Sequence, residues 1–178
     1  MNHHTPLRRL AEGGLIAAMY AALTMALTFS SFGVVQFRVA EMLTILPIFT
    51  PAAIPGLAVG CLVANLLSPY GPVDIVIGSL ATLIAAILTQ KTNHAWLAPL
   101  PPVVCNMVLV GGMLAWYEVG FSAQFPALFA VNALWVGIGE AVVCYVLGIL
   151  LLRAIPNVSY LRRYVPEARR SFRRAHSA

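Results

Sequence analysis

The sequence predicts an all-α integral membrane protein with six transmembrane helices. Three observations support this fold class: the composition is very apolar, charges are confined to a few positions, and turn residues divide the apolar stretches at helix-length intervals. Of 178 residues, 60% are hydrophobic and 10% are charged, whereas soluble domains average about 45–50% and about 25%. This composition excludes a soluble globular domain, a disordered chain and a basic nucleic-acid-binding module.

Runs without Asp, Glu, Lys or Arg mark the segments expected in the hydrocarbon. A helix needs roughly 20 residues to cross about 30 Å of hydrocarbon. Turn signals divide the runs near residues 31–33, 51–55, 68–72, 89–93 and 120–126. We therefore expect helices at residues 10–31, 34–50, 54–67, 73–89, 97–118 and 126–153.

The second and third expected helices, 34–50 and 54–67, are short and bounded by proline. Irregular or interrupted spans often line a cavity, because free backbone groups are tolerated in a membrane only against protein or water. We interpret these two segments as walls of an internal site rather than as simple crossings.

Basic residues predict the orientation. Arg8 and Arg9 precede the first helix, and six arginines lie within residues 162–178. Because such residues favour the cytoplasmic side, we expect both termini, and the loop with Lys91, in the cytoplasm. The predicted organisation is a six-helix domain at residues 1–155 in the cell membrane and a basic cytoplasmic tail at 156–178.

Several polar residues fall in the outer half of the predicted bundle or at its centre. A carboxylate at the bilayer centre costs about 2.5–3.5 kcal/mol on insertion scales, and a purely structural protein gains little from it. We predict a water-accessible pocket open to the outside. Its expected lining is Glu41, Asn65, Asp74, Asn106 and Glu140, with Arg38 on the same helix face as Glu41.

Each charged residue also has a structural interpretation. Arg38 and Glu41 are three residues apart and could form a simple salt bridge. Asp74 could cap the fourth helix, and Glu118 is expected to be a solvated loop residue. Glu140 has the weakest structural alternative, because no basic residue lies near it in the sequence.

Aromatic and amide residues extend the candidate site. Trp135 precedes Glu140 by five residues and is a candidate to stack on a flat ligand. Hydrogen bonds between helices are the structural alternative for three amides, namely Asn65, Asn106 and Asn132.

Small residues recur at every fourth position of the first helix. They are Gly14, Ala18, Ala22, Ala26 and Ser30. Small residues at this spacing let another helix approach closely. The stripe is either an internal packing surface or a docking face for a separate membrane subunit.

Enzyme and nucleotide-binding motifs are absent from the sequence. It contains no GxxxxGK[ST], no GxSxG and no HExxH. Six helices are also few for a stand-alone transporter built from two repeats. We therefore expect a protein that is not an enzyme and that binds a ligand while another subunit supplies the energy.

Several segments carry a resemblance to a known family. They are residues 36–41 (QFRVAE), 46–47, 53–57 (AIPGL), 60–61, 64–65, 74–83 (DIVIGSLATL), 101–106 (PPVVCN), 139–140 and 145–148. In these stretches the chain resembles the QueT family, the substrate-binding S-components of energy-coupling-factor (ECF) transporters assigned to queuosine precursors.

The resemblance implies an S-component-like bundle that captures a vitamin-like ligand from outside. It also implies partners, a transmembrane coupling protein and two cytoplasmic ATPases, which use ATP, while this chain carries no cofactor. The stripe of Ala18, Ala22 and Ala26 resembles the docking face of such subunits.

For this family the expected ligand is a deazaguanine, such as queuine or its aminomethyl precursor. Glu140 or Glu41 would accept its N–H edge, and the remaining acids an aminomethyl cation. Asn65 and Asn106 would bond its carbonyl and ring nitrogens, with Trp135 as the stacking wall. The alternatives are an S-component for another vitamin, a proton-coupled carrier that uses Glu41, Asp74 and Glu140, and a structural assembly protein.

Overall fold

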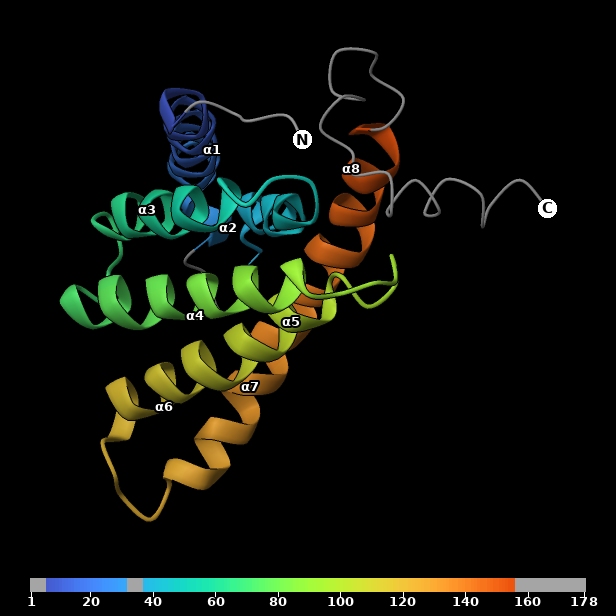
Figure 1. Cartoon of the computed structure of the whole chain (residues 1–178). Helices are drawn as coiled ribbons and strands as arrows, with labels where there is room; N and C mark the ends of the chain where they lie inside the picture. The colour runs from blue at the N-terminus through green and yellow to red at the C-terminus, as the bar shows by residue number, and fades with distance from the viewer. Residues whose placement is uncertain (1–5, 32–36, 156–178) are drawn as a thin grey trace.

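The computed structural model describes residues 6–31 and 37–155, and the regular structure in these two ranges is entirely helical. The elements are α1 (Pro6–Ala26), α2 (Thr28–Ser31), the 3₁₀ helix η1 (Val39–Ile48), α3 (Ala53–Asn65), α4 (Pro72–Gln90), α5 (Leu100–Cys105), the π-helix η2 (Asn106–Val110), α6 (Gly111–Val119), α7 (Phe125–Val142), the π-helix η3 (Val143–Gly148) and α8 (Ile149–Ala154) (Figure 1). The predicted all-α class is confirmed for the described residues.

These elements group into six helical segments. The helix α2 follows α1 after one residue, α5 to α6 form one continuous rod, and α7 to α8 form another. Three segments are long and apolar enough to cross a membrane, namely Pro72–Gln90, Leu100–Val119 and Phe125–Ala154. The number of crossings and the side on which the termini lie stay predictions, and the expected tail at 156–178 lies outside the described residues.

The second segment differs from the expected helix at 34–50. Residues 34–36 lie outside the described ranges, and η1 is a 3₁₀ helix of 10 residues that contains Pro47. Proline has no amide hydrogen to donate to a regular helix. Runs of 3₁₀ helix longer than three or four residues are uncommon, and they often mark a functional site or a strained sequence. With 10 and 13 residues, η1 and α3 are both short, as expected.

Small residues allow α1 and α3 to cross closely. A Cβ atom placed on Gly56 would lie 2.6 Å from the carbonyl oxygen of Gly13, and one on Gly60 would lie 2.8 Å from that of Ala17. Close backbone approach through small residues is a main source of helix association in lipid. The buried face of α1 therefore carries Gly13 and Ile16, whereas Ala18 and Ala22 lie on its exposed side.

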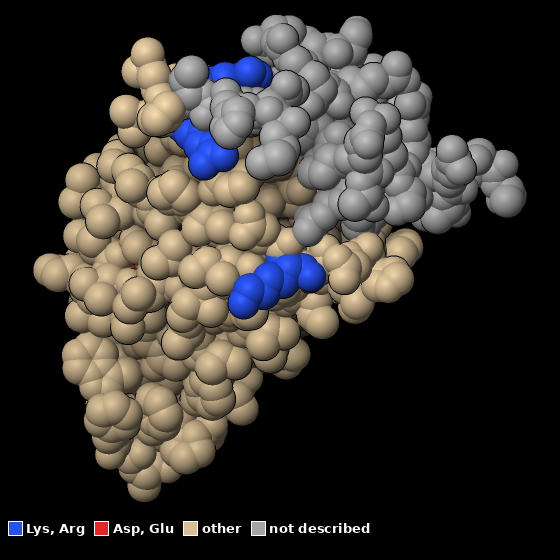
Figure 2. Space-filling model, viewed as in Figure 1, with Lys and Arg blue, Asp and Glu red and all other residues tan. Residues whose placement is uncertain are grey.

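The exterior of the bundle is apolar, and three of the five acidic residues in the described ranges are inside it. Large hydrophobic side chains such as Leu80, Leu134 and Leu150 are exposed, which is the arrangement expected of helices surrounded by lipid. The face shown in Figure 2 carries basic side chains and hardly any acidic atoms. Three of the acidic residues, Glu41, Asp74 and Glu140, are fully buried.

The connection from α3 to α4 and the end of α6 lie at the same end of the bundle, at the left of Figure 1. The loop between α3 and α4 and the end of α6 line a common groove of about 530 Å³. In this groove the rings of Tyr70 and Tyr117 meet edge to face, with centroids 5.4 Å apart. Gly71 directly precedes α4 and has φ 64° and ψ −147°, a conformation that only glycine adopts readily.

Candidate functional site

The polar residues predicted for the site lie at helix ends and irregular turns, and nearly all are buried. Arg38 precedes η1, Glu41 is in its first turn, Asn65 ends α3, Asp74 is in the first turn of α4, Asn106 begins η2, and Glu140 lies near the end of α7. All six have at most 1% of their surface exposed. These six residues are called the polar cluster below.

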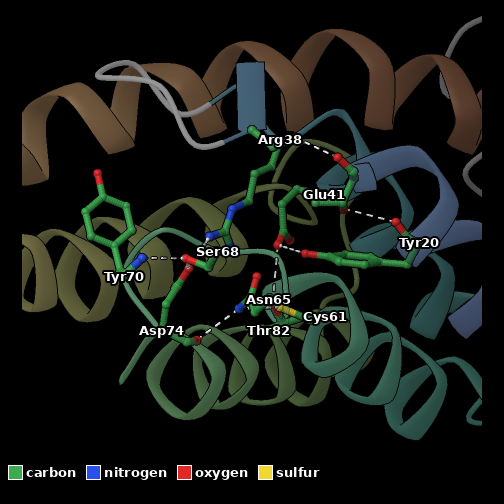
Figure 3. Close-up of polar contacts among 11 residues, drawn as sticks. Tyr20, Arg38, Glu41, Cys61, Asn65, Ser68, Tyr70, Asp74 and Thr82 are labelled. Atoms are coloured by element: carbon green, nitrogen blue, oxygen red, sulfur yellow. Dashed lines mark hydrogen bonds and ion pairs between the residues drawn. The ribbon is translucent and has the colours of Figure 1, made fainter. Parts of the chain in front are cut away.

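The first part of the cluster is an ion pair between Arg38 and Asp74. The guanidinium Nη2 lies 3.3 Å from Oδ2 and 3.5 Å from Oδ1 of Asp74. The hydroxyl of Ser68 donates to the same carboxylate at 2.6 Å, and it also accepts the backbone N–H of Tyr70 (Figure 3). The carboxylate of Asp74 is therefore both charge-balanced and hydrogen-bonded.

Gly78 leaves the space in which this ion pair sits. A Cβ atom at Gly78 would lie 2.5 Å from Nδ2 of Asn65 and 2.9 Å from Oδ1 of Asp74. Asn65 donates through Nδ2 to the backbone carbonyl of Asp74 at 2.9 Å, which joins the end of α3 to the start of α4. Its Oδ1 has no hydrogen-bond partner among the described residues.

The second part of the cluster surrounds Glu41. Its Oε1 accepts the hydroxyl of Tyr20 at 2.5 Å and that of Thr82 at 3.3 Å, so α1 and α4 hold the carboxylate from two sides (Figure 3). Its second oxygen, Oε2, is buried and accepts no hydrogen bond from the part of the chain that the structure describes. A buried acceptor without a hydrogen bond costs free energy of folding, because burial removes its hydration.

Glu140 approaches Glu41 from α7. The thiol of Cys144 lies 3.6 Å from Oε2 of Glu140 and 3.7 Å from the backbone carbonyl of Glu41. This thiol therefore joins the side chain of Glu140 to the backbone of Glu41. Because η3 begins at Val143, a π-turn sits beside this contact, and such turns occur frequently at functional sites.

Asn106 completes the second part. It begins the π-helix η2, which packs against α7, the helix that carries Glu140. Neither its amide nitrogen nor its amide oxygen makes a hydrogen bond of ordinary geometry within the described residues. Asn106 and Glu41 thus present buried donor and acceptor atoms that nothing in the described chain satisfies.

Two of the structural interpretations are modified by these contacts. Asp74 does not cap α4 with its side chain; Gly71 occupies the cap position, and the Asp74 carboxylate binds Arg38 and Ser68 instead. The guanidinium of Arg38 forms its ion pair with Asp74, 36 residues away in the chain, rather than with its sequence neighbour Glu41.

The structure does not bring every predicted residue to the cluster. Trp135 is 42% exposed and lies on the outer side of α7 with Leu134 and Ile138. Glu118 is exposed, as expected, and accepts a hydrogen bond from Asn132 at 3.2 Å.

Four residues of the site were not predicted: Tyr20, Ser68, Thr82 and Cys144. They are uncharged residues within or beside apolar runs, so hydropathy does not distinguish them. A signal was present only for Cys144, which follows Glu140 by one helical turn and therefore shares its face.

Fold and site together define a class of protein: an α-helical membrane protein whose apolar exterior encloses buried ionisable and amide side chains. The family model described as QueT transporter matches residues 10–157, and the chain therefore belongs to the QueT transporter family. This is a family of transporters and not of enzymes.

One curated relative and the solved structures complete the comparison. The protein named Queuosine precursor transporter QueT from Lactococcus lactis subsp. cremoris (strain MG1363) is 40% identical over 72 residues, which are 39% of this chain and 42% of the relative. The matched region thus spans less than half of that relative. No solved structure matches the chain significantly.

Proposed function

We propose that this chain is the substrate-binding membrane subunit, the S-component, of an ECF-type importer, and that it captures a queuosine precursor from outside the cell. Membership in the QueT transporter family and the name of the Lactococcus lactis relative support this substrate class. The observation that carries the proposal is the polar cluster, in which buried atoms of Glu41, Asn65 and Asn106 have no partner among the described residues.

A deazaguanine base fits the chemistry of these atoms. Its guanine-like edge presents adjacent N–H donors, which a carboxylate accepts with both oxygens. Glu41 or Glu140 supplies that carboxylate, while Asn65 and Asn106 offer amide atoms to the base carbonyl and ring nitrogens. Trp135 is left out of this arrangement, because its side chain lies on the outer side of α7.

Selectivity follows from the cost of an unmade hydrogen bond. A site built to bond a ligand's N–H groups rejects an analogue without them, because its own buried acceptor then stays unpaired. Purine analogues that lack the exocyclic amine should therefore bind far more weakly than the deazaguanine.

The proposed partners are a transmembrane coupling protein and two cytoplasmic ATPases, which would supply the ATP-driven step. The exposed side of α1 supports this proposal, because Ala18, Ala22 and Ala26 form a strip of small side chains that another helix can approach closely. In this arrangement the chain is a multi-pass protein of the cell membrane, with both termini in the cytoplasm.

The experiment is calorimetry on the purified full chain in lipid nanodiscs. The variant Glu140→Gln should lower the affinity for a 7-deazaguanine base at least about tenfold, as expected when a hydrogen bond to a charged group is weakened. Glu118→Gln, at an exposed carboxylate outside the cluster, should leave the affinity unchanged. Unchanged binding in Glu140→Gln would remove Glu140 from the site, and no binding by the unmodified chain would reject the proposed function.

A proton-coupled carrier is the second candidate, and the buried acids Glu41 and Glu140 favour it, because ionisable residues inside membranes often relay protons. Proteoliposomes that contain this chain alone distinguish the two. Uptake driven by a pH gradient without ATPases would support the carrier, and uptake only with the coupling protein, ATPases and ATP would support the S-component.

A further inference from the structure

An apolar groove of about 610 Å³ runs along the contact between α1 and α3. Among the described residues that line it, Arg9 is the one with a charged side chain, and the others are proline, glycine and aliphatic residues. No member of the polar cluster lies among these lining residues. The groove is therefore a second feature of the molecule, separate from the proposed binding site.

Small residues keep this groove open. A Cβ atom at Gly14 would meet no atom of the described residues within 4 Å, so Gly14 faces open space. A Cβ atom at Gly56, in contrast, would lie 2.6 Å from the carbonyl oxygen of Gly13. The two helices thus touch through their backbones at the floor of the groove, and the space beside Gly14 is left for an apolar chain.

The groove is about as long as one leaflet of a bilayer is deep. The helices α1 and α3 run in the same sense, because Gly13 meets Gly56 and, one turn further, Ala17 meets Gly60. The groove follows α1 from Pro6 to Ala17, which is about 16 Å at 1.5 Å per residue. Half of the hydrocarbon core of a bilayer is about 15 Å thick.

The charge lies at the end of the groove where both helices begin. Arg9 is in the first turn of α1, and α3 starts beside it at Ala53. The N-termini of helices carry partial positive charge, which adds to that of the guanidinium. The neighbouring Arg8 is bonded to Glu12 at 3.1 Å, whereas no acidic side chain lines the described groove. The groove is therefore positive at one end and apolar along the rest.

We propose that this groove binds one anionic phospholipid of the cytoplasmic leaflet, with its phosphate on Arg9 and an acyl chain along Gly14 and Ala17. Guanidinium groups bind phosphate oxygens through paired N–H donors, and the cytoplasmic leaflet is rich in anionic lipids. A phospholipid carries a negative head group directly beside an apolar chain, which is the arrangement that the groove complements.

This lipid site is compatible with the proposed docking strip on α1. The residues of that strip, Ala18, Ala22 and Ala26, do not line the groove. The lipid and a coupling protein would therefore occupy different sides of α1. The inference uses the proposed orientation of the chain but not the identity of the transported ligand.

The test is native mass spectrometry of the full chain in micelles that contain equal amounts of phosphatidylglycerol and phosphatidylcholine with the same acyl chains. The unmodified chain should retain one phosphatidylglycerol with about fivefold preference, the ratio expected for one basic residue at a lipid surface. Arg9→Gln should lower this ratio to less than about twofold. Lys91→Gln, at an exposed basic residue outside the groove, should keep it. Equal retention of both lipids by the unmodified chain, or an unchanged preference in Arg9→Gln, would overturn the inference.

A second variant tests the apolar part of the site. Gly14→Leu fills the open part of the groove without a clash at Cβ and should lower the retention of both lipids at least about threefold, because the acyl chain loses its apolar contacts. Ala11→Leu, exposed on α1 outside the groove, should retain lipid like the unmodified chain.

Two results with Gly14→Leu would overturn the site. One is full lipid retention. The other is full lipid retention together with loss of the coupling protein on co-purification, because a partner helix would then use the groove in place of a lipid. The comparison of the two lipids on the unmodified chain decides the inference even if a variant does not fold.

Discussion

Arg38 and Asp74 lie 36 residues apart in the chain and form an ion pair that is closed to solvent, with Nη2 and Oδ2 separated by 3.3 Å. The pair ties the segment that enters η1 to the first turn of α4. It also decides which acids of the cluster are available to a ligand, because it neutralises one of the three.

Removing one member of this pair should destabilise the protein strongly. Asp74→Ala leaves a buried guanidinium without its carboxylate, and breaking a buried pair in this way costs about 3–5 kcal/mol. The double variant Arg38→Met, Asp74→Leu should recover a large part of that loss, because no unpaired charge remains. Thermal unfolding in detergent measures both.

The control for this prediction is the pair at the start of α1. Arg8 and Glu12 are 3.1 Å apart on a partly exposed helix surface, where such pairs contribute about 0.3–0.5 kcal/mol. Arg8→Met should therefore hardly shift the unfolding midpoint. Similar losses in Asp74→Ala and Arg8→Met would show that the buried pair is not a strong constraint.

Gly78 should not tolerate a methyl group. The Cβ atom of Gly78→Ala would collide with Asn65 and Asp74, and overpacking of this kind costs about 1–3 kcal/mol. We expect reduced thermal stability and weaker ligand binding. At Gly112→Ala the nearest atom is a ring carbon of Phe129 at 3.6 Å, which is ordinary contact, so this variant should be stable; equal behaviour of the two would contradict the packing argument.

Tyr20→Phe should weaken the cluster from the side of α1. The variant keeps the ring but deletes the hydroxyl that donates to Glu41, and a hydrogen bond to a charged group contributes about 1.5–3 kcal/mol. Stability and ligand affinity should both fall in unfolding and calorimetry experiments. Tyr117→Phe, at an exposed position of α6, is the matched control. Unchanged ligand affinity in Tyr20→Phe would show that Tyr20 does not contribute to the binding site.

The outer side of α1 should matter for assembly and not for binding. Ala22→Leu places a bulky side chain on the proposed docking strip and should reduce co-purification of the coupling protein and ATPases with the tagged chain. Ligand affinity should stay unchanged. Ala130→Leu, at an exposed position of α7, should leave assembly intact; equal recovery of the partners by both variants would argue against docking through α1.

The six helical segments could be predicted from the sequence, because a helix that crosses the bilayer needs about 20 predominantly apolar residues. Charge-free runs and the turn residues between them reflect this requirement. It also predicted the members of the polar cluster. Charged and amide residues are costly where an apolar segment faces lipid, so residues such as Glu140 and Asn106 are recognisable without coordinates.

The pairing within the cluster could not be predicted in this way. Helical spacing favours Arg38 with Glu41, but the turn before η1 directs the guanidinium to Asp74. Tyr20 and Thr82 were missed, because a hydroxyl in an apolar run leaves little trace in hydropathy. Trp135 is a different case: five residues correspond to about 140° around a helix, so helical phase alone separates it from Glu140.

The contact of Cys144 with Glu41, which lies 103 positions earlier in the chain, has a consequence for biosynthesis. Glu41 is synthesised early, whereas Glu140 and Cys144 belong to the last helical segment. A nascent chain that stops before α7 contains Arg38, Asp74 and Glu41 but lacks half of the carboxylate pair. The proposed binding site is therefore complete only when translation is nearly finished.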